Sequence, residues 1–405
     1  MLFQTLDDKK DCVGVYLNGE LVYDKLPAGI SQTWDYSTFL RDHDVDYAKI
    51  YCGGKTLNEV CPPHLRTQWD AISSRLRAYF RSFQFAKVSL DENCFFDMVP
   101  KQFLLDYCEV KNRVTQHVLD TYERPANYDF IKDLSVALDD MRYQRLNIDI
   151  GALRPLYHKA PTRKFMKSVQ KYTPYCKYNI WGTKTGRLTS IPGSFPILTI
   201  DKQYRSVLKP NNDWFLELDY NAAELRVAMA LAGQEQPEND IHQWNIDNIF
   251  GPMDRQDAKR GIFSWLYGRK NIDAALTTND GTVEKLLQET YGRERIVSEH
   301  WTGTHVRTRF NRTIPSDRHH ALSYIIQSSC VDVVLRRLIQ ITERLRDLKS
   351  RVAFTLHDSI VIDLSNEDRG LIPELINLFG QNELGRFKVN VQAGRDFGTM
   401  KALNL

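Results

Sequence analysis

The pattern of apolar residues along the chain changes near residue 60. Before it, short strand-like runs occupy residues 13–16 and 20–23, on either side of Asn18-Gly19, and residues 47–51, before Gly53-Gly54. Short runs rich in apolar and aromatic residues between turn residues are typical of β-strands, and Asn-Gly between two such runs is typical of a hairpin turn. The first 60 residues therefore predict a small α/β region with a hairpin and a further strand at residues 47–51.

Helical spacing follows from residue 62 to about residue 150, where apolar residues fall three or four positions apart in successive segments. A strand-like run ends at Asp219 and changes there to helical spacing, and a long helical stretch occupies roughly residues 241–300. The chain then closes with a helix at residues 320–349, an apolar hairpin at 351–364, a helix near 371–379 and a strand at 387–394. Together these elements predict a mixed α/β fold.

Charge is distributed unevenly, although the whole chain is almost neutral. It has 54 lysines and arginines against 51 aspartates and glutamates, a formal net charge of +3. Residues 151–210 alone hold 12 of the basic residues, Arg205 among them, and one acidic residue, Asp201. Aromatic residues such as Tyr172 and Trp181 are interspersed here, which a disordered basic tail would lack. The segment therefore predicts contact with nucleic-acid phosphates rather than a merely solvated face.

Neither the cysteines nor the apolar residues indicate a zinc site, a secretory leader or a membrane span. The seven cysteines form no Cys-x-x-Cys pair and show no histidine spacing suited to zinc. The first residues lack a basic stretch followed by an apolar one, and no window approaches the length of a transmembrane helix. We expect a soluble, cytoplasmic protein without a membrane partner.

Two aspartates stand where apolar strands end. Asp219 closes the run that precedes a helix, and Asp358 lies in His357-Asp358-Ser359, between the strands of the C-terminal hairpin. Each aspartate alone also fits a structural role, as a helix N-cap or a turn residue. As a pair, two carboxylates can bind two Mg²⁺ ions about 4 Å apart, the arrangement that activates an attacking oxygen and stabilises a leaving one.

A stripe of side chains at four-residue spacing is the more specific pattern. Arg255, Lys259, Phe263 and Tyr267 recur on one face of a predicted helix that is followed by Gly268. An ordinary amphipathic helix also repeats at this spacing, but its buried face would not begin with two cations, nor its solvated face continue with two aromatic rings. The stripe suits a ligand with a polyphosphate at one end and a base with its sugar at the other.

Five motifs resemble, in order, those of the family A DNA polymerases, the DNA polymerase I type. At residues 184–190 the stretch KTGRLTS resembles the family's TGRLSS motif. At residues 219–226 DYNAAELR resembles motif A, DYSQIELR, and at residues 356–359 LHDS resembles motif C, LHDE. The stripe helix is similar to motif B, and HHALSYIIQSS at 319–329 resembles the family's helix ending in QG or QS. The resemblance covers about residues 180–400, and His319 with Gln327-Ser328 is similar to the phage branch.

The resemblance implies a right-hand polymerase fold with an antiparallel-sheet palm, helical fingers and a short helical thumb. The implied parts are a small α/β region of unknown role at 1–95, a thumb-like region at 96–165, a palm at 166–235 and 318–405, and fingers at 236–317 with the motif B helix at 254–268. Only about 30 residues separate residue 150 from the TGR motif, so any thumb is expected to come mainly from helices between residues 100 and 150.

The resemblance also implies a role for each motif residue, in a reaction where a primer 3′-hydroxyl attacks the α-phosphate of a dNTP on a DNA template. Asp219 and Asp358, assisted by the Tyr220 carbonyl, would bind two Mg²⁺ ions, with Mn²⁺ as an expected substitute, and Lys259 would join them in catalysis. Glu224 and Tyr267 would exclude ribonucleotides at the sugar. The implied dNTP-binding residues are Arg255, Lys259, Phe263, Tyr267, Glu224 and His242. The implied DNA-binding residues are Arg187, Thr185, Arg205, Gln327, His357 and His319.

The sequence departs from the family pattern at three motif positions. Ser359 stands where the family has glutamate, Ala222 where it has glutamine, and Ser323 where it has asparagine. The first change removes a carboxylate near the metals but not a principal ligand, so activity is expected to survive. No 3′→5′ exonuclease is expected, because residues 1–95 are too short for that domain. Low processivity is therefore predicted unless a processivity factor or a replisome partner such as a helicase-primase holds the DNA.

Two other functions remain as alternatives to viral DNA replication. A single-subunit RNA polymerase shares the palm and the His-Asp-Ser triplet, but Glu224, Phe263 and the TGR motif favour the DNA enzyme. A polymerase fold kept only as a DNA-binding subunit would be expected to lose its carboxylates and its phosphate-binding pair first, and this chain keeps all four.

Overall fold

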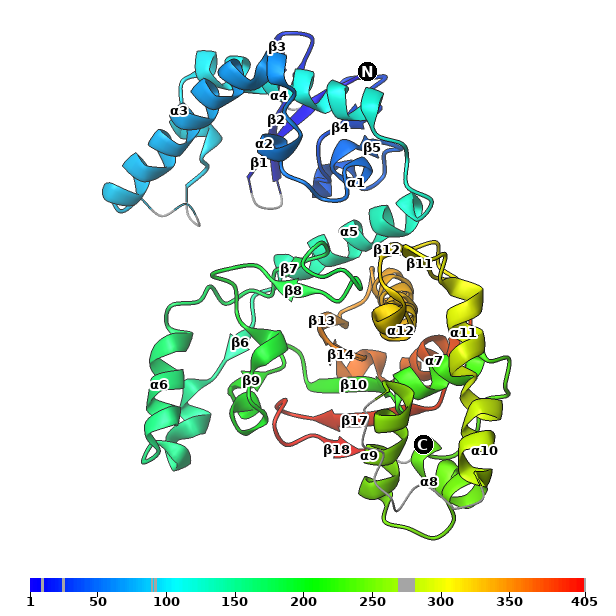
Figure 1. Cartoon of the computed structure of the whole chain (residues 1–405). Helices are drawn as coiled ribbons and strands as arrows, with labels where there is room; N and C mark the ends of the chain where they lie inside the picture. Colours follow the sequence, from blue (N-terminus) through cyan, green and yellow to red (C-terminus); the bar gives the residue numbers. More distant parts are fainter. Residues whose placement is uncertain (9–10, 24–25, 89, 91–92, 269–280, 404–405) are drawn as a thin grey trace. The chain divides into compact units, whose positions relative to one another are not determined.

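The computed structural model describes residues 1–8, 11–23, 26–88, 90, 93–268 and 281–403. The chain divides into two compact units, Met1–Tyr143 and Gln144–Leu405 (Figure 1). The division expected near residue 95 falls inside the first unit, and the one expected near residue 165 falls inside the second.

The first unit begins with the hairpin that the sequence predicts. Strands β1 (Gln4–Asp8), β2 (Asp11–Leu17) and β3 (Glu20–Val22) form an antiparallel sheet in that order. Asn18 and Gly19 connect β2 to β3 with φ angles of 50° and 87°. Positive φ at both central residues is what a two-residue hairpin turn requires, and Asn-Gly adopts it with little strain.

The strand predicted at residues 47–51 is wrong for most of its length. Strand β5 (Asp46–Tyr47) pairs in parallel with β4 (Gln32–Thr33), and the next four residues form helix α1 (Ala48–Tyr51). Gly53, with φ of 63°, follows the Cys52 C-cap. The Gly-Gly pair is therefore the left-handed end of a helix, not the turn after a strand.

Helices make up the rest of the first unit, as their spacing predicts. They are α2 (Leu57–Val60), α3 (Arg66–Phe85), α4 (Lys101–Thr121) and α5 (Tyr128–Arg142). Helix α4 packs against α3 and β1, and one core joins strand residues such as Tyr16 to helix residues such as Trp69 and Phe103. The helices that follow residue 95 therefore share a core with the residues that precede it.

An antiparallel five-stranded sheet is the centre of the second unit. Its order is β13-β14-β10-β17-β18, and the strands are β10 (Trp214–Tyr220), β13 (Arg351–Leu356), β14 (Ser359–Leu364), β17 (Val389–Gly394) and β18 (Lys401–Ala402) (Figure 1). The predicted strand before residue 220, the hairpin and the last strand are thus confirmed. Strand β10 lies between β14 and β17, although the chain forms it more than a hundred residues earlier.

Helices α7 (Ala223–Leu231), α12 (Arg318–Arg344) and α13 (Ile372–Gly380) pack around this sheet. Helix α12 contacts α7 and β13, whereas α13 contacts β10 and β17. Side chains such as Ile325, Val333 and Leu338 are buried along α12, as expected from their spacing. The sheet and these helices form the framework on which the site is built.

The helical stretch near residues 241–300 begins with two capped helices. Helix α8 (Ile241–Asn245) has Asp240 as its N-cap, and α9 (Arg255–Leu266) has Asp254. In each case the aspartate accepts hydrogen bonds from backbone N–H groups of the first turn. Helices α10 (Thr282–Tyr291) and α11 (Arg293–His300) complete the stretch, while residues 269–280 lie outside the described part.

The basic segment, residues 151–210, consists mainly of short elements, among them α6 (Ala160–Val169) and the 3₁₀ helix η6 (Lys202–Val207). The described part of the second unit also contains these short strands: β6 (Asn147–Ile148), β7 (Tyr178–Asn179), β8 (Thr189–Ser190), β9 (Leu208–Lys209), β11 (His305–Arg307), β12 (Thr313–Pro315), β15 (Gln381–Asn382) and β16 (Gly385–Arg386). Over the described ranges, every helix is too short or too polar to span a bilayer.

Candidate active site

Two adjacent strands bring Asp219 and Asp358 to the same end of the sheet. Asp219 is the penultimate residue of β10 and lies opposite Ser359, the first residue of β14. Asp358 immediately precedes Ser359 in the two-residue turn from β13, in which His357 has φ of 56°. The two carboxylates that the sequence singles out are therefore neighbours because of the pairing of β10 with β14.

The electrostatics of this pair favour a bound cation. Burial, followed by the nearby carboxylates of Glu217 and Asp358, raises the pKa of Asp219 to about 7, although Asn390 Nδ2 donates to Asp219 Oδ2 at 3.3 Å. Burial also raises the pKa of Asp358. Among the described residues, neither aspartate forms an ion pair with a lysine or arginine. Carboxylate oxygens are the ligands that Mg²⁺ prefers, so this donor set fits the two-metal site that the sequence predicts.

Glu217 is a third carboxylate at this end of the sheet. It lies two residues before Asp219 on β10, and Ser359 Oγ donates to Glu217 Oε1 at 3.0 Å. Burial raises the pKa of Glu217. The sequence analysis does not single out Glu217 or Asn390. The two-residue alternation within FLELDY is a signal for Glu217, but nothing local indicates that the strand of Asn390 pairs with β10.

One cavity of about 430 Å³ collects most of the predicted nucleotide-binding residues. It is lined by Asp219, Tyr220, Asn221, Ala222, Ala223, Glu224, His242, Arg255, Lys259, Phe263, Asp358 and Asn390. The stripe on α9 thus faces the two aspartates, with its cations and one aromatic ring at the cavity. The side chain of Tyr220 is buried and its hydroxyl donates to the Phe379 carbonyl at 2.5 Å, so only its main-chain carbonyl remains as a predicted ligand.

The two cations of the stripe differ in their partners. Arg255 donates to Asp240 through Nε at 3.2 Å and through Nη2 at 2.7 Å, a bidentate ion pair. Asp240 is in turn the N-cap of α8 and accepts from Asn221 Nδ2 at 2.8 Å. No ion pair of Lys259 is found within the described ranges. Lys259 can therefore bind an anion in the cavity without breaking an ion pair, whereas the charge of Arg255 is largely compensated by Asp240.

His242 is a buried, neutral side chain at the cavity. Burial lowers its pKa to about 4; the Asp240 carboxylate opposes this shift, and the charges of Arg255 and Lys259 add to it. Its Nδ1 atom is buried without a hydrogen-bond partner in the described part of the chain. The imidazole ring lies 6.3 Å from that of Phe263, centre to centre. A neutral imidazole can donate one hydrogen bond to a ligand that enters the cavity.

Glu224 connects the stripe to the TGR motif. Tyr267 Oη donates to Glu224 Oε2, and Arg187 Nη2 donates to Glu224 Oε1 at 2.8 Å. Burial and the Glu224 carboxylate raise the pKa of Tyr267, which therefore stays protonated. Because both oxygens of Glu224 accept a hydrogen bond, its carboxylate is fixed beside the cavity. The structure brings together three residues that the sequence assigned to the sugar and to DNA.

A turn at Gly186 positions Arg187. Gly186 has φ of 83°, and a Cβ atom there would lie 2.5 Å from the guanidinium carbon of Arg312. Arg312 forms an ion pair with the buried Asp332 of α12, with Nη2 to Oδ1 at 2.5 Å. Thr185 is buried in the same turn. The TGR motif is thus held next to α12, and glycine is needed both for its backbone and for its lack of a side chain.

A second cavity, of about 400 Å³, lies on another side of the two aspartates. Asp219 and Asp358 line it together with Glu217, His357, Ser359, Gln392 and two cations of η6, Lys202 and Arg205. The guanidinium of Arg205 lies 4.7 Å from the ring of Phe397. The predicted DNA-binding residues Arg205 and His357 are therefore close to the carboxylates, at a cavity separate from that of the α9 stripe.

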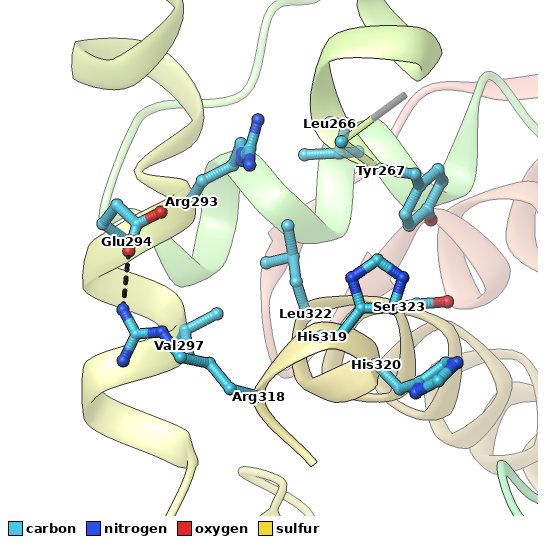
Figure 2. A pocket seen from close by; sticks show the side chains of 11 residues that line it. Leu266, Tyr267, Arg293, Glu294, Val297, Arg318, His319, His320, Leu322 and Ser323 are labelled. Carbon is cyan, nitrogen blue, oxygen red and sulfur yellow. Dashed lines mark hydrogen bonds and ion pairs between the residues drawn. The ribbon is translucent and has the colours of Figure 1, made fainter. Parts of the chain in front are cut away.

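Other predicted DNA-binding residues lie on α12. Figure 2 shows a cavity of about 450 Å³ between α9, α11 and α12, with Tyr267, His319 and His320 on one side and Arg293 and Arg318 on the other. Gln327 is half-buried further along α12. The cavity beside Tyr267 thus contains His319, as predicted, and adds Arg293 and Arg318, which the sequence analysis did not select.

Comparison with known proteins identifies the segment that carries these residues. A sequence model of DNA polymerase family A matches residues 153–399. Thermostable DNA polymerase I of Thermus aquaticus is 24% identical over 240 residues, which are 48% of this chain and 28% of the relative. The DNA polymerase of Mycobacterium phage L5 is 26% identical over 214 residues, 44% of this chain and 34% of that one. The matched segment spans only about 28% of the length of the bacterial relative.

A solved structure extends the likeness to nearly the whole chain. The POL domain of Pol1 from M. smegmatis, solved in complex with DNA primer-template and dNTP, aligns with a TM-score of 0.63 and 12% identity. The alignment covers 98% of this chain and 96% of that domain. At this identity the match establishes the fold, including that of the residues before 153.

Proposed function

This chain belongs to DNA polymerase family A, and we propose that it is a DNA-directed DNA polymerase that extends a primer by two-metal-ion catalysis. The observation that carries the proposal is the position of Asp219 and Asp358 between two cavities. One cavity contains Lys259, Arg255 and Phe263, and the other contains Arg205 and Lys202. Phosphoryl transfer needs the attacking and leaving oxygens on opposite sides of the phosphorus, and two separate cavities that share one carboxylate pair can hold the nucleotide and the primer end apart.

The first cavity suits the incoming dNTP. Lys259 binds the triphosphate directly, and Arg255 joins it by exchanging part of its ion pair with Asp240. His242 donates a hydrogen bond from its neutral ring, and Phe263 packs against the base and sugar. Negative charge on the leaving pyrophosphate then develops next to Lys259, which is the reason to place this lysine among the catalytic residues.

The second cavity suits the primer end. Arg205 and Lys202 bind backbone phosphates there, and His357 lies next to Asp358 at the point where the 3′-hydroxyl must arrive. Bound by the two aspartates, Mg²⁺ ions would activate this hydroxyl and neutralise the transferred phosphate. The carboxylates themselves position the reacting groups, and Asn390 orients Asp219 by its hydrogen bond.

Glu224 and Tyr267 provide the selection against ribonucleotides. Glu224 lines the first cavity together with Phe263, Tyr267 donates a hydrogen bond to Glu224 from beside that cavity, and Arg187 keeps the carboxylate in place. A 2′-hydroxyl would have to displace this hydrogen-bonded group. Gln327 and Arg187 contact the minor groove of the new base pair, and the cavity with His319 receives template DNA.

The proposal includes the right-hand layout and a viral setting. The five-stranded sheet with α12 forms the palm, α8 to α11 form the fingers, and the thumb-like region at residues 96–165 contains α4, α5 and α6. The similarity to a phage DNA polymerase supports a role in viral genome replication. A processivity factor or helicase-primase as a partner stays a prediction from the sequence.

Primer extension tests the function. The intact protein is incubated with a primed DNA template, Mg²⁺ and either dNTPs or rNTPs, in parallel with Asp358→Asn and a control, Asp347→Asn. Asp347 is an exposed carboxylate that follows α12. We expect extension with dNTPs by the wild type and the control only. Extension by Asp358→Asn, or equal use of rNTPs by the wild type, would refute the proposal.

A further inference from the structure

We propose that Tyr178 is a positioning residue that sets the place of Asp358 relative to Arg187. The proposal rests on the proposed function, because it concerns how that site distinguishes matched from mismatched primer ends. Tyr178 is buried on β7, and its hydroxyl makes two hydrogen bonds with one residue of β13. It donates to the Thr355 carbonyl at 2.7 Å and accepts from the Thr355 N–H at 3.1 Å. Thr355 lies just before the turn that carries Asp358.

These two hydrogen bonds take the place of a neighbouring strand. Strand β13 is at the edge of the five-stranded sheet, and an edge strand has main-chain groups that no other strand satisfies. Thr355 is 2% exposed, so leaving its N–H and C=O groups without partners would be costly. A hydroxyl can donate and accept at once, which a phenylalanine ring cannot do. Tyr178 therefore fixes the edge strand at the point where it leads into the turn.

The side chain of Thr355 extends this support to the far side of the turn. Thr355 Oγ1 donates to the Ser359 carbonyl at 2.8 Å. Leu356 and Ser359 are paired in the ladder between β13 and β14, so His357 and Asp358 alone form the connection. The short turn thus has little freedom to move apart from Thr355, the residue that Tyr178 holds.

On its other side, Tyr178 belongs to the strand pair that closes the TGR loop. Strand β7 pairs with β8, and residues 180–188, which include Arg187, connect the two strands. A small cavity of about 30 Å³ is lined by residues of both the loop and the turn. Its lining includes Arg187, Leu188, Thr355, His357 and Asp358. The loop and the turn are therefore neighbours, and Tyr178 is a hydrogen-bonded link between them.

This link has a consequence in the proposed function, where Arg187 contacts the minor groove and Asp358 acts at the primer 3′-hydroxyl. Every correct base pair presents acceptors in the minor groove, whereas a mismatched pair displaces them. A displaced Arg187 loop then shifts the turn of Asp358 through Tyr178 and Thr355, because hydrogen-bond networks can couple two sites. The tyrosine hydroxyl thus makes the rate of extension depend on the fit of the terminal base pair.

A purely structural role is the alternative, in which Tyr178 only stabilises the fold. Lower stability reduces the amount of active protein for every primer alike, so the ratio of matched to mismatched extension rates would stay the same. Lost positioning reduces the rate on a matched primer more, because only a matched primer profits from the alignment. The ratio therefore distinguishes the two roles.

Two tyrosine variants provide the comparison. Tyr178→Phe removes the hydroxyl and keeps the ring. Tyr128→Phe is the matched control, since the Tyr128 hydroxyl is also buried and accepts from a main-chain N–H group, that of Tyr47, at 2.7 Å. Both tyrosines of the control pair lie in the first unit, Met1–Tyr143.

Single-nucleotide incorporation is measured on a matched primer and on one with a mismatched 3′ nucleotide. For Tyr178→Phe we expect kcat on the matched primer to fall about tenfold or more, with KM for the dNTP nearly unchanged. The ratio of matched to mismatched rates should fall with it, and Tyr128→Phe should keep the values of the wild type. An unchanged ratio in Tyr178→Phe, or an equal fall in Tyr128→Phe, would overturn the proposal.

Hydrogen exchange separates the failure of this proposal from the failure of the proposed function. Exchange is measured by mass spectrometry on peptides that cover residues 351–360. We expect faster exchange confined to this segment in Tyr178→Phe, because the Thr355 N–H loses its acceptor. If the wild type extends no primer but exchange rises in this way, the proposed function fails and the hold of Tyr178 on the turn stands. If the wild type extends primers and Tyr178→Phe matches it in ratio and exchange, the role of Tyr178 alone fails.

Discussion

Lys259 is the side chain whose removal should most directly damage nucleotide use. It lines the first cavity without an ion-pair partner in the described part of the chain, whereas Arg255 is bound to Asp240. We expect Lys259→Ala to lower kcat/KM for dNTPs by about 10²-fold or more, because a charge-assisted contact to the reacting phosphates is lost. Single-nucleotide incorporation kinetics measure this. Lys285→Ala, on the exposed face of α10, is the control, and similar kinetics for both variants would contradict the assignment.

His242 should make stability depend on pH in one window. Its folded-state pKa of about 4 lies below the ordinary value of 6.5, so between these values the unfolded chain binds a proton that the folded chain does not. The free energy of unfolding should therefore fall as the pH is lowered from 6.5 to 4. Below pH 4, His242 should contribute little further change. Arg255 holds the pKa of Asp240 below its usual range, so that ion pair is lost only below this window.

Urea unfolding at pH 7 and pH 4.5 measures the effect of His242. We expect the wild type to lose on the order of 1–2 kcal/mol more than His242→Asn over this interval, after allowance for solvent at the cavity. Equal losses in the two proteins would show that His242 does not titrate as its burial indicates.

The sequence predicted site residues that belong to a local motif, but not those that reach the site only through the pairing of distant strands. Lys259 stands out because a cation in an aromatic stripe is unusual in a local window, whereas Asp219 and Asp358, each of which fits an ordinary cap or turn alone, stand out as a pair within ordered motifs. Asn390 is inconspicuous in its own strand, and only the register of β17 against β10 brings it to Asp219. Glu217 had a local signal in strand alternation, but its partner Ser359 is 142 positions away.

The turn that carries the TGR motif offers a test at the level of elements. Gly186 and Gly193 have nearly the same φ, 83° and 84°, but a Cβ at Gly186 meets the guanidinium of Arg312, while one at Gly193 meets nothing within 4 Å. Gly193→Ala should lower the free energy of unfolding only by the backbone strain, about 1 kcal/mol. Gly186→Ala should lower the free energy of unfolding by about 1–3 kcal/mol more and reduce primer extension, because Arg312 must leave the buried Asp332.

Thermal unfolding and primer extension of the two glycine variants, compared side by side, isolate the contact from the strain. Equal stabilities would mean that the Arg312 side chain moves away without cost, and that the turn is not held against α12 as the ion pair indicates.

The conformation of a glycine also explains why the strand predicted at residues 47–51 was wrong. A short buried helix before Gly53 and a strand before a turn share the same apolar residues, and φ at the glycine decides between them.

At the scale of the whole molecule, the sequence predicted the order of helices and strands better than it predicted which of them share a core. Helical and strand spacing predicted nearly every long element, because burial on one face leaves a period that can be read locally. The grouping of α4 with the N-terminal strands was not accessible in this way. It depends on contacts such as that between Gln4 on β1 and Thr115 on α4, 111 positions apart, in which Gln4 Nε2 donates to Thr115 Oγ1 at 3.1 Å.

The concentration of charge in one segment leads to a prediction for the whole molecule. Although the net charge is only +3, residues 151–210 carry 12 of the basic residues and a single acidic one, so DNA affinity should fall steeply with salt. If Lys202 and Arg205 both contact phosphates, replacing them with alanine should reduce the slope of log K against log salt by about 2. Binding of primer-template measured by fluorescence anisotropy at several salt concentrations gives this slope.

The matched control replaces Lys285 and Arg295, cations on α10 and α11 that pair with Glu289 and Glu299. Both double variants lower the net charge of the protein by the same amount. A general electrostatic attraction would therefore change both slopes equally, whereas direct phosphate contacts change only that of the Lys202 and Arg205 variant. Equal slopes would place the DNA elsewhere than the second cavity and would separate the primer end from the carboxylates that are proposed to activate it.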